Sequence, residues 1–271
     1  MPKKLLDGAQ LAGYIKERQA KQARTLRQAH RIIPRLAIVQ TLDDPVINTY
    51  VRLKKKYGAE IGIEVDSHFV AQDEALELIQ RLNEDASVHG IIVQLPLADR
   101  TQTDQLLQSV APEKDVDGLG SDAFFEPATP MAIMWLLSGY NIELRGKQIL
   151  LIGRGKLVGA PLEKQLLNSG LNVSVVERSK KILDASSISA DVIITATGSP
   201  AILYPNMIKE GAVVVDAGVA SEDGKTVGDV APEVYERDDI TITPTKGGVG
   251  PLTVCALFDN VIRSAQRIAE S

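Results

Sequence analysis

The chain has little of what marks several protein classes. Its 271 residues include one cysteine, Cys255, so no internal disulfide can form, and its apolar neighbours indicate a small core residue rather than a nucleophile. No segment reaches the roughly 20 apolar residues that a membrane-spanning helix needs. The 30 basic and 35 acidic residues give a net charge of -5, which offers no general attraction to nucleic acid or to an anionic membrane. We therefore expect a cytoplasmic protein with no nucleic-acid partner and no membrane partner.

Histidines are also few. His30, His68 and His89 lie far apart in different predicted elements, and none is paired with a cysteine or a carboxylate at a spacing typical of metal ligands. We expect each to be a surface or core residue and predict no metal site.

The residues that are present indicate an α/β fold. The chain is 44% hydrophobic, and apolar runs of strand length alternate with longer amphipathic segments, which is typical of mainly parallel sheets. The predicted strands cover residues 35–40, 64–70 and 90–95 in the first half, and 148–152, 172–177, 192–195, 212–216 and 240–243 in the second. Helices are expected to fill the intervals between the strands, notably over residues 11–27, 46–61, 73–82 and 252–268.

A turn-rich region, residues 114–130, separates the two series of strands, and we take it as the domain boundary. The last helix follows the second series, and we expect it to return to the first domain. The prediction is an N-terminal α/β domain with a parallel sheet, residues 1–118 plus 252–271, and a Rossmann-like nucleotide-binding domain, residues 119–251.

A glycine loop follows the first strand of the second series. Gly153, Gly155 and Gly159 have the spacing G-x-G-x-x-x-G, one residue longer than the commonest dinucleotide fingerprint. Such glycines permit a tight turn and let a pyrophosphate approach the amides at a helix N-terminus, although a plain strand-to-helix turn is the alternative.

The end of the next strand bears on the choice of coenzyme. Glu177 lies 18 residues past Gly159, near the offset at which an acidic residue contacts the ribose 2'-hydroxyl of NAD. Arg178 and Ser179 come directly afterwards, and together with Arg154 they favour the 2'-phosphate of NADP. A solvated turn is the alternative for this cluster.

Two residues of the first half share one face of a predicted helix, because Tyr50 and Lys54 are four positions apart. A lysine transfers protons near neutral pH only where desolvation or a neighbouring charge lowers its pKa. A run of three lysines, residues 54–56, is more often a solvated face, and that alternative stays open.

Two more polar residues are expected at the same edge of the first sheet. Gln94 ends a buried strand and is able to hold an amine by a hydrogen bond, whereas Asp117 in the interdomain turn is able to accept two hydrogen bonds from a heterocycle. A strand cap and an ordinary Asx turn before Gly118 are the respective alternatives.

Taken in order along nearly the whole chain, eight groups of segments resemble one family, the methylenetetrahydrofolate dehydrogenase/cyclohydrolase enzymes of the FolD type. The segments are 50–54 with 60–63, 90–97, 114–118, 127–130, 152–161, 215–218, 228–230 and 247–253.

The resemblance implies two linked reactions. NADP or NAD takes a hydride from 5,10-methylenetetrahydrofolate, and the methenyl cation is hydrolysed to 10-formyltetrahydrofolate. It implies that Lys54 transfers the proton, that Tyr50 stacks on the folate ring, that Gln94 tunes Lys54 and that Asp117 binds the pterin edge. It also implies a homodimer formed through the nucleotide domain.

Two further residue sets follow from the same resemblance. Besides Tyr50, Lys54, Gln94 and Asp117, the expected folate-binding residues are Leu95, Gly247, Gly248, Gly250, Pro251 and Thr253. The glycines allow a backbone to lie against a flat ring before Pro251 opens the final helix. The expected coenzyme-binding residues are Thr129, Gly153, Arg154, Gly155, Val158, Gly159, Arg178, Ser179, Gly198 and Val219.

The sequence departs from the family pattern at several positions. Ile47 replaces a serine, Ala128 replaces a cysteine, Gly155 and Lys156 replace Ser-Asn or Ser-Lys, and Lys246 lies in a loop that normally reads Pro-Val-Pro-Gly-Gly. Arg178 replaces a histidine. We favour NADP, with NAD possible, because Ser179 is retained and Arg154 and Arg178 are able to pair with the phosphate.

Two alternatives compete with this interpretation. A shikimate-dehydrogenase-like NADP oxidoreductase has a similar domain order but does not account for residues 93–97 and 247–251. A catalytically silent nucleotide-binding protein does not account for Lys54, because a dead site has no need of a buried amine that costs desolvation energy.

Overall fold

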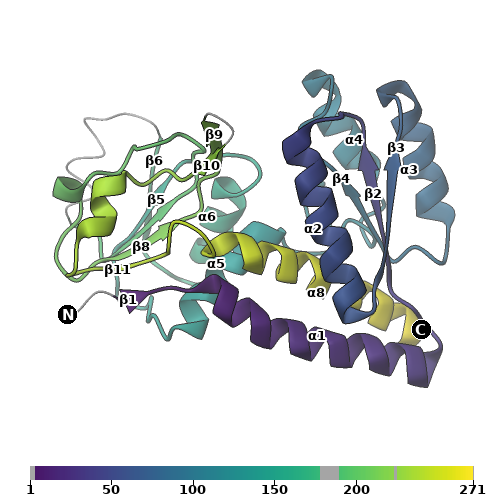
Figure 1. Ribbon diagram of the computed structural model, residues 1–271, viewed down its shortest axis with the longest axis horizontal. Coiled ribbons are helices and arrows are strands. Elements are labelled where there is room, and N and C mark those ends of the chain that lie inside the picture. Colours follow the sequence, from purple (N-terminus) through teal and green to yellow (C-terminus); the bar gives the residue numbers. More distant parts are fainter. Residues whose placement is uncertain (1–3, 178–188, 223–224, 271) are drawn as a thin grey trace. The chain divides into compact units, whose positions relative to one another are not determined.

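The computed structural model describes residues 4–177, 189–222 and 225–270, which belong to two compact units (Figure 1). The six-stranded unit comprises Met1–Ala12 and Thr129–Thr253, and the three-stranded unit comprises Gly13–Ala128 and Val254–Ser271. Two long helices, α1 (Gly8–His30) and α8 (Val249–Glu270), begin in the six-stranded unit and continue in the three-stranded unit.

The three-stranded unit contains a parallel sheet in the order β3-β2-β4. Its strands are β2 (Arg35–Gln40), β3 (Glu64–Phe69) and β4 (Gly90–Val93). Its other elements are α2 (Pro45–Ile61), η1 (Gln72–Glu74), α3 (Ala75–Glu84), η2 (Arg100–Gln102) and α4 (Thr103–Ser109). The central strand is apolar and almost wholly buried, as expected for a parallel sheet covered on both faces.

Helices cover the two faces of this sheet. Residues of α3 and α4 share one buried cluster with Ala37 and Val39 of β2 and with Ile91 and Val93 of β4. Across the other face, a Cβ on Gly58 of α2 would collide with β3 and touch α8, so these elements pack with nothing between them.

The six-stranded unit contains a second parallel sheet, in the order β1-β11-β8-β7-β5-β6. Its strands are β1 (Lys4–Leu5), β5 (Ile149–Ile152), β6 (Val173–Val176), β7 (Val192–Thr195), β8 (Val213–Asp216) and β11 (Thr241–Ile242). The other elements are α5 (Ala128–Gly139), α6 (Gly159–Asn168), η3 (Pro205–Met207), η4 (Pro232–Glu236) and an antiparallel hairpin of β9 (Ala220–Glu222) and β10 (Lys225–Val227).

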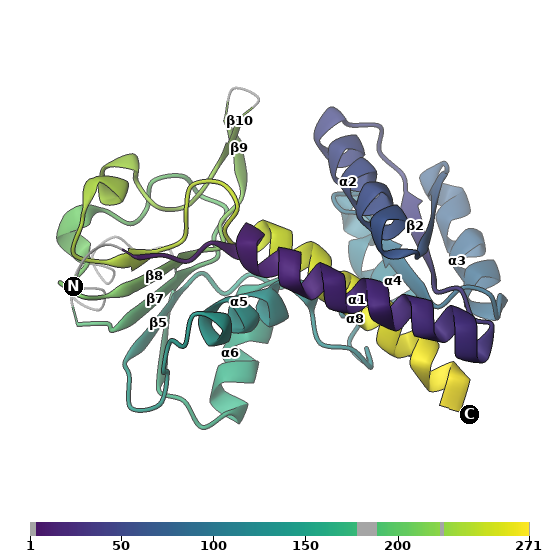
Figure 2. The same ribbon diagram turned by 60° about the horizontal axis from the view of Figure 1, so that its bottom comes forward.

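The strand order reverses at β5, which pairs with β6 on one side and with β7 on the other. In an open parallel sheet this reversal marks the crevice at the carboxyl ends of the strands where ligands bind. Helices α5 and α6 lie together on one face of the sheet (Figure 2).

The expected α/β fold with two parallel sheets is confirmed, and the predicted strands agree with the structure to within two residues at each end. The final helix begins at Val249 rather than at Pro251, which lies in its first turn. Cys255 is fully buried, as expected for a core residue. Within the described ranges, none of the helices combines the length and apolarity needed to cross a bilayer.

Candidate functional site

Helix α2 presents Tyr50 and Lys54. Its start is defined by Asp44, whose carboxylate accepts hydrogen bonds from the amides of Val46 and Ile47, and by a proline at the first helical position. The helix ends at Ile61 and is capped by Gly62, which adopts the left-handed conformation at φ 79°. These caps place the two functional side chains on adjacent turns of a helix with fixed ends.

Lys54 is the central residue of the first candidate site. Its Nζ donates a hydrogen bond to Oε1 of Gln94 at 2.7 Å, and the residue is half-buried, whereas Lys55 and Lys56 are exposed. Burial lowers the pKa of Lys54, and the negative charge of Asp117 offsets part of this effect. The alternative of a solvated lysine face therefore describes Lys55 and Lys56 but not Lys54.

Gln94 follows β4 and is tied to the sheet by its backbone, whose N–H donates to the carbonyl of Val39 at 2.8 Å. Its side-chain amide donates to the carbonyl of Leu95 at 3.0 Å, which directs the amide oxygen to Lys54. The ring of Tyr50, one turn before Lys54, is exposed at 38%.

Asp117 lies in the loop after the strand series and is coupled electrostatically to Lys54. Burial raises its pKa, the positive charge of Lys54 lowers it, and the nearby Asp115 raises it further. The structure thus brings Lys54, Gln94 and Asp117 together within one unit, as the sequence predicts.

The turn at Gly118 is built by Asp115, a residue to which the sequence analysis gave no role. One Asp115 oxygen accepts from the amide of Gly118 at 3.0 Å and the other from the amide of Gly120 at 2.7 Å. Gly118 has φ 69° and packs tightly enough that a Cβ would lie 2.7 Å from the carbonyl oxygen of Phe125. The Asx-type turn that was the alternative interpretation of Asp117 is therefore made by Asp115. The Asp117 carboxylate is not used for this turn.

Asn260 of α8 is a second residue that the sequence analysis missed. It is fully buried, and its side-chain nitrogen donates to the carbonyl oxygens of Val116 and Glu126, both at 3.0 Å. The hydroxyl of Ser264, one turn later, donates to the carbonyl of Glu113 at 3.2 Å. Two polar residues on the otherwise apolar face of α8 were the available signal, and they anchor the segment that carries Asp117.

The second candidate site is the glycine loop between β5 and α6. Gly153 adopts φ 100°, and a Cβ there would lie 2.7 Å from the carbonyl oxygen of Ala196. A Cβ on Gly159 would collide with the backbone of Gly153, whereas a Cβ on Gly155 would make only an ordinary contact, 4.0 Å from the carbonyl oxygen of Ala196. Helix α6 begins at Gly159, so its first amides lie beside the loop, as a pyrophosphate site requires.

Arg154 in this loop is held by a carboxylate. Its Nε donates to Oε2 of Glu163 on α6 at 2.6 Å. This hydrogen bond, together with the negative charges of Glu163 and Glu177, raises the pKa of Arg154. Glu177 is exposed at the end of β6. Arg178 and Ser179 lie outside the described residues.

The other expected coenzyme-binding residues also belong to the six-stranded unit. Gly198 follows β7 with φ 63°, and a Cβ there would lie 3.3 Å from the carbonyl oxygen of Val219, which follows β8 and is 58% exposed. Thr129 and Val158 are half-buried near the starts of α5 and α6.

Five further predicted folate residues lie around the start of α8: Gly247 and Gly248 in the loop before it, and Gly250, Pro251 and Thr253 at its beginning. Gly247 has φ 85°, its carbonyl accepts from the amide of Ala9 at 2.9 Å, and a Cβ on Gly8 would collide with the carbonyl of Gly248. A Cβ on Gly250 would meet open space. The hydroxyl of Thr253 donates to the carbonyl oxygen of Val249 at 3.4 Å.

The departures from the family pattern fall in different environments. Ile47 and Ala128 are buried core residues, while Lys246 and Lys156 are exposed. Because a Cβ at position 155 would come no closer than 4.0 Å to its nearest neighbour, the carbonyl oxygen of Ala196, the glycine there is not required by packing.

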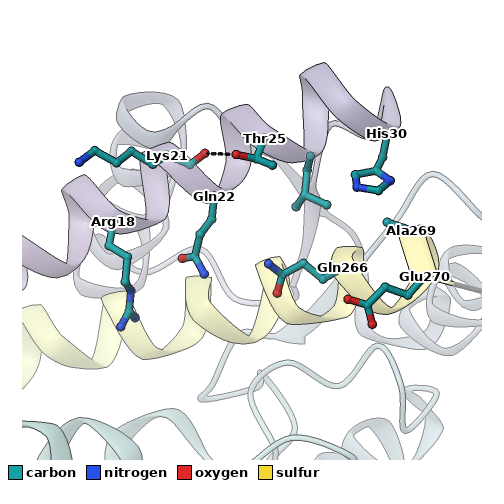
Figure 3. Close-up of a pocket in the computed structure, with 9 residues that line it drawn as sticks. Arg18, Lys21, Gln22, Thr25, His30, Gln266, Ala269 and Glu270 are labelled. Carbon is teal, nitrogen blue, oxygen red and sulfur yellow. Dashed lines mark hydrogen bonds between the residues drawn. The ribbon is translucent and has the colours of Figure 1, made fainter.

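A groove of about 310 Å³ lies elsewhere in the three-stranded unit, between α1 and α8. Figure 3 shows the side chains of Gln22 and Gln266 pointing into it, and none of the predicted site residues lines it. In the part of the chain that the structure describes, no group of histidine, cysteine and carboxylate side chains is placed to hold a metal ion.

Comparison with known proteins gives matches over both units. Residues 6–117 match the family model for the tetrahydrofolate dehydrogenase/cyclohydrolase catalytic domain, and residues 127–269 match that for the tetrahydrofolate dehydrogenase/cyclohydrolase NAD(P)-binding domain. The chain is 41% identical to a bifunctional protein FolD of Campylobacter jejuni over 97% of its own length and 98% of that protein.

Solved structures agree with these matches. The Trypanosoma brucei methylenetetrahydrofolate dehydrogenase-cyclohydrolase complexed with NADP cofactor and inhibitor superposes with a TM-score of 0.93 at 29% identity, covering 100% of both chains. A shikimate 5-dehydrogenase of Listeria monocytogenes shares only the fold, with a TM-score of 0.54 at 12% identity over 87% of this chain and 96% of that one. The chain therefore belongs to the tetrahydrofolate dehydrogenase/cyclohydrolase family.

Proposed function

We propose that this protein oxidises 5,10-methylenetetrahydrofolate to the methenyl form with NADP and then hydrolyses that product to 10-formyltetrahydrofolate. The observation that carries the proposal is the cluster of Lys54, Gln94 and Asp117 in a member of this family. The cluster holds an amine with a lowered pKa beside a carboxylate that is suited to a pterin.

Lys54 serves the hydrolysis. Water attacks the methenyl carbon as its proton passes to the Lys54 amine, which becomes an ammonium. The bond between that carbon and N5 then breaks, N5 takes the proton back from Lys54, and the remaining hydroxyl proton leaves to solvent. The product carries its formyl group on N10, and one proton is released overall.

Neighbouring side chains prepare this amine. Because burial lowers the pKa of Lys54, a larger fraction of it is neutral near pH 7 than of an exposed lysine. Asp117 accepts hydrogen bonds from the pterin edge, and Tyr50 provides an exposed ring for stacking. Leu95 and residues Gly247, Gly248, Gly250, Pro251 and Thr253 complete the proposed folate-binding set.

NADP, when bound, supplies the acceptor for the hydride that leaves the methylene carbon. The glycine loop and the first amides of α6 bind the pyrophosphate, and Arg154 with Arg178 and Ser179 binds the 2'-phosphate. Thr129, Gly153, Gly155, Val158, Gly159, Gly198 and Val219 line the same site. The NADP complex of the trypanosomal relative supports this choice, while NAD remains the competing coenzyme.

The remaining assignments concern the whole protein. The three-stranded unit supplies the catalytic groups, and the six-stranded unit binds the coenzyme. We also propose that the protein works as a cytoplasmic homodimer joined through the six-stranded unit.

The dehydrogenase is tested by mixing purified protein with methylenetetrahydrofolate and either NADP or NAD. Reduced coenzyme should appear with NADP, and no reduction of either coenzyme would contradict the proposal. Lys54→Ala should abolish methenyl hydrolysis and leave measurable hydride transfer. The matched control is Lys55→Ala, which changes the exposed lysine next to it and should keep both activities.

A further inference from the structure

Two aspartates at the carboxyl edge of the six-stranded sheet have no part in the proposed chemistry. Asp216 ends β8, and Asp229 follows the β9–β10 hairpin. Asp229 is fully buried at 0% exposure, and Asp216 is half-buried. Buried carboxylates are costly unless hydrogen bonds stabilise their charge, so their partners indicate what they do.

Asp229 holds the loop that follows β7. One of its oxygens accepts from the amide of Thr197 at 2.7 Å, and the other accepts from the amide of Ser199 at 2.9 Å. These two amides flank Gly198, whose φ of 63° makes the turn. A single carboxylate therefore fixes both sides of this turn.

Asp216 in turn holds the segment that carries Asp229. It accepts from the amides of Asp229 and Val230, both at 3.1 Å, and from the amide of Gly218 at 3.0 Å. The hydroxyl of Thr195 donates to it at 3.1 Å. The ends of β7 and β8 and the segment after the hairpin are thus joined through two carboxylates.

Two glycines make room for these carboxylates in a reciprocal way. A Cβ on Gly218 would lie under 3.0 Å from the carboxyl group of Asp229, and a Cβ on Gly228 would lie under 3.0 Å from that of Asp216. Each carboxylate therefore packs directly against backbone next to the other aspartate.

The loop that Asp229 holds is in contact with the glycine loop. A Cβ on Gly153 would lie 2.7 Å from the carbonyl oxygen of Ala196 and 2.8 Å from Cγ2 of Thr197. The backbone turn at Gly153 thus packs directly against Ala196 and Thr197. A displacement of Thr197 has to move the glycine loop or break the contact between that loop and residues Ala196 and Thr197.

We infer that Asp229 is a positioning residue for coenzyme binding, which holds the Thr197–Ser199 turn against the glycine loop and is itself held by Asp216. This inference rests on the proposed function only in taking the glycine loop as the coenzyme site. Asp229 acts through the backbone of its neighbours.

The test compares NADP binding by the full-length wild type and by Asp229→Asn, measured by titration calorimetry without folate. The substitution keeps the size of the side chain but turns an N–H donor toward one of the two amides. We expect binding to weaken by about ten- to a hundredfold, the effect of losing a charged hydrogen bond.

The control is Asp191→Asn, the same change at the amino end of β7, where Asp191 accepts from the amide of Gln148 at 2.8 Å. The dissociation constant of Asp191→Asn for NADP should stay within about twofold of the wild-type value, because Asp191 lies at the opposite end of β7 from the proposed coenzyme site. Methenyl hydrolysis, which uses no coenzyme, should persist in both variants.

The outcomes separate the two proposals. A lower melting temperature for Asp229→Asn with an unchanged dissociation constant shows a purely structural role and overturns the inference alone. A wild type that binds neither NADP nor NAD overturns the proposed coenzyme site as well. If Asp229→Asn does not fold, amide hydrogen exchange of the wild type tests the inference instead. The amides of Thr197 and Ser199 should be protected from exchange. Rapid exchange at these two amides overturns the inference.

Discussion

The Nζ of Lys54 donates a 2.7 Å hydrogen bond to the side-chain oxygen of Gln94, and the direction of this bond matters. A neutral amine that gives one N–H to Gln94 has its lone pair directed away from that residue. An amide oxygen is a poor base, so it orients the amine without taking its proton. Gln94 therefore suits a lysine that has to gain and lose a proton in each turnover.

Replacing Gln94 with glutamate should alter the pH dependence of the hydrolysis. A carboxylate at this position stabilises the ammonium form and raises the pKa of Lys54, so the acidic limb of the cyclohydrolase profile should move upward by about one to three pH units. The pH profile of the dehydrogenase should not move with it. The control is Gln108→Glu, at an exposed position of α4. If the acidic limb of the cyclohydrolase profile does not move in Gln94→Glu, Gln94 does not tune the pKa of Lys54.

Asp117 should make stability fall as pH rises. Burial raises its pKa in the folded protein, so the folded state binds more protons than the unfolded state between the ordinary aspartate pKa and the raised value. The free energy of unfolding should decrease in that window by about 1.4 kcal/mol for each pH unit.

Urea unfolding of Asp117→Asn across this window should lack that decrease. The exposed Asp122→Asn serves as control and should keep the wild-type slope. Equal slopes for the wild type and Asp117→Asn would show that the Asp117 carboxylate titrates alike in the folded and unfolded chains.

Asn260→Leu should loosen the segment that carries Asp117. The change removes two buried hydrogen bonds and leaves the carbonyls of Val116 and Glu126 without this donor, which should cost about 2–3 kcal/mol of stability. The KM for folate should rise while the dissociation constant of NADP stays unchanged. Ser264→Ala removes the single longer bond to Glu113 and should cost less than about 1 kcal/mol, so the two variants form a graded pair.

The glycine loop offers a pair of contrasting positions. Gly159→Ala should weaken NADP binding by at least about tenfold, because its Cβ collides with the backbone of Gly153 and forces the loop open. Gly155→Ala should bind NADP within about twofold of wild type, since its Cβ makes only an ordinary contact, 4.0 Å from the carbonyl oxygen of Ala196. Equal losses in both variants would mean that packing within the loop does not determine its binding conformation.

The sequence was most informative where signals are local. Alternation of apolar runs and helices predicted the strands of both parallel sheets except β1, and the glycine spacing predicted the turn at Gly153. The bounds of helix α5 were not predicted, because it is apolar around its whole surface and begins inside a turn-rich region. Strand β1 has two residues, too few for any period to appear.

The candidate site was predictable in its charged residues but not in their supports. Lys54, Gln94 and Asp117 lie in recognisable segments, and a parallel sheet places such segments at one edge. Asn260 lies 144 positions from Val116, and Asp229 lies 32 positions from Thr197, so no local pattern joins either pair. The burial of Lys54 beside its exposed neighbours likewise depends on tertiary packing.

The close packing of Asp229 against Gly218 and of Asp216 against Gly228 also restricts which substitutions the sequence can accept. An alanine at position 218 is sterically acceptable only where position 229 carries a smaller side chain, and position 228 depends on Asp216 in the same way. Substitutions at each pair should therefore show strong coupling in a double-mutant cycle, with the second change relieving much of the damage done by the first. A lineage can replace either pair, but only by passing through a less stable intermediate.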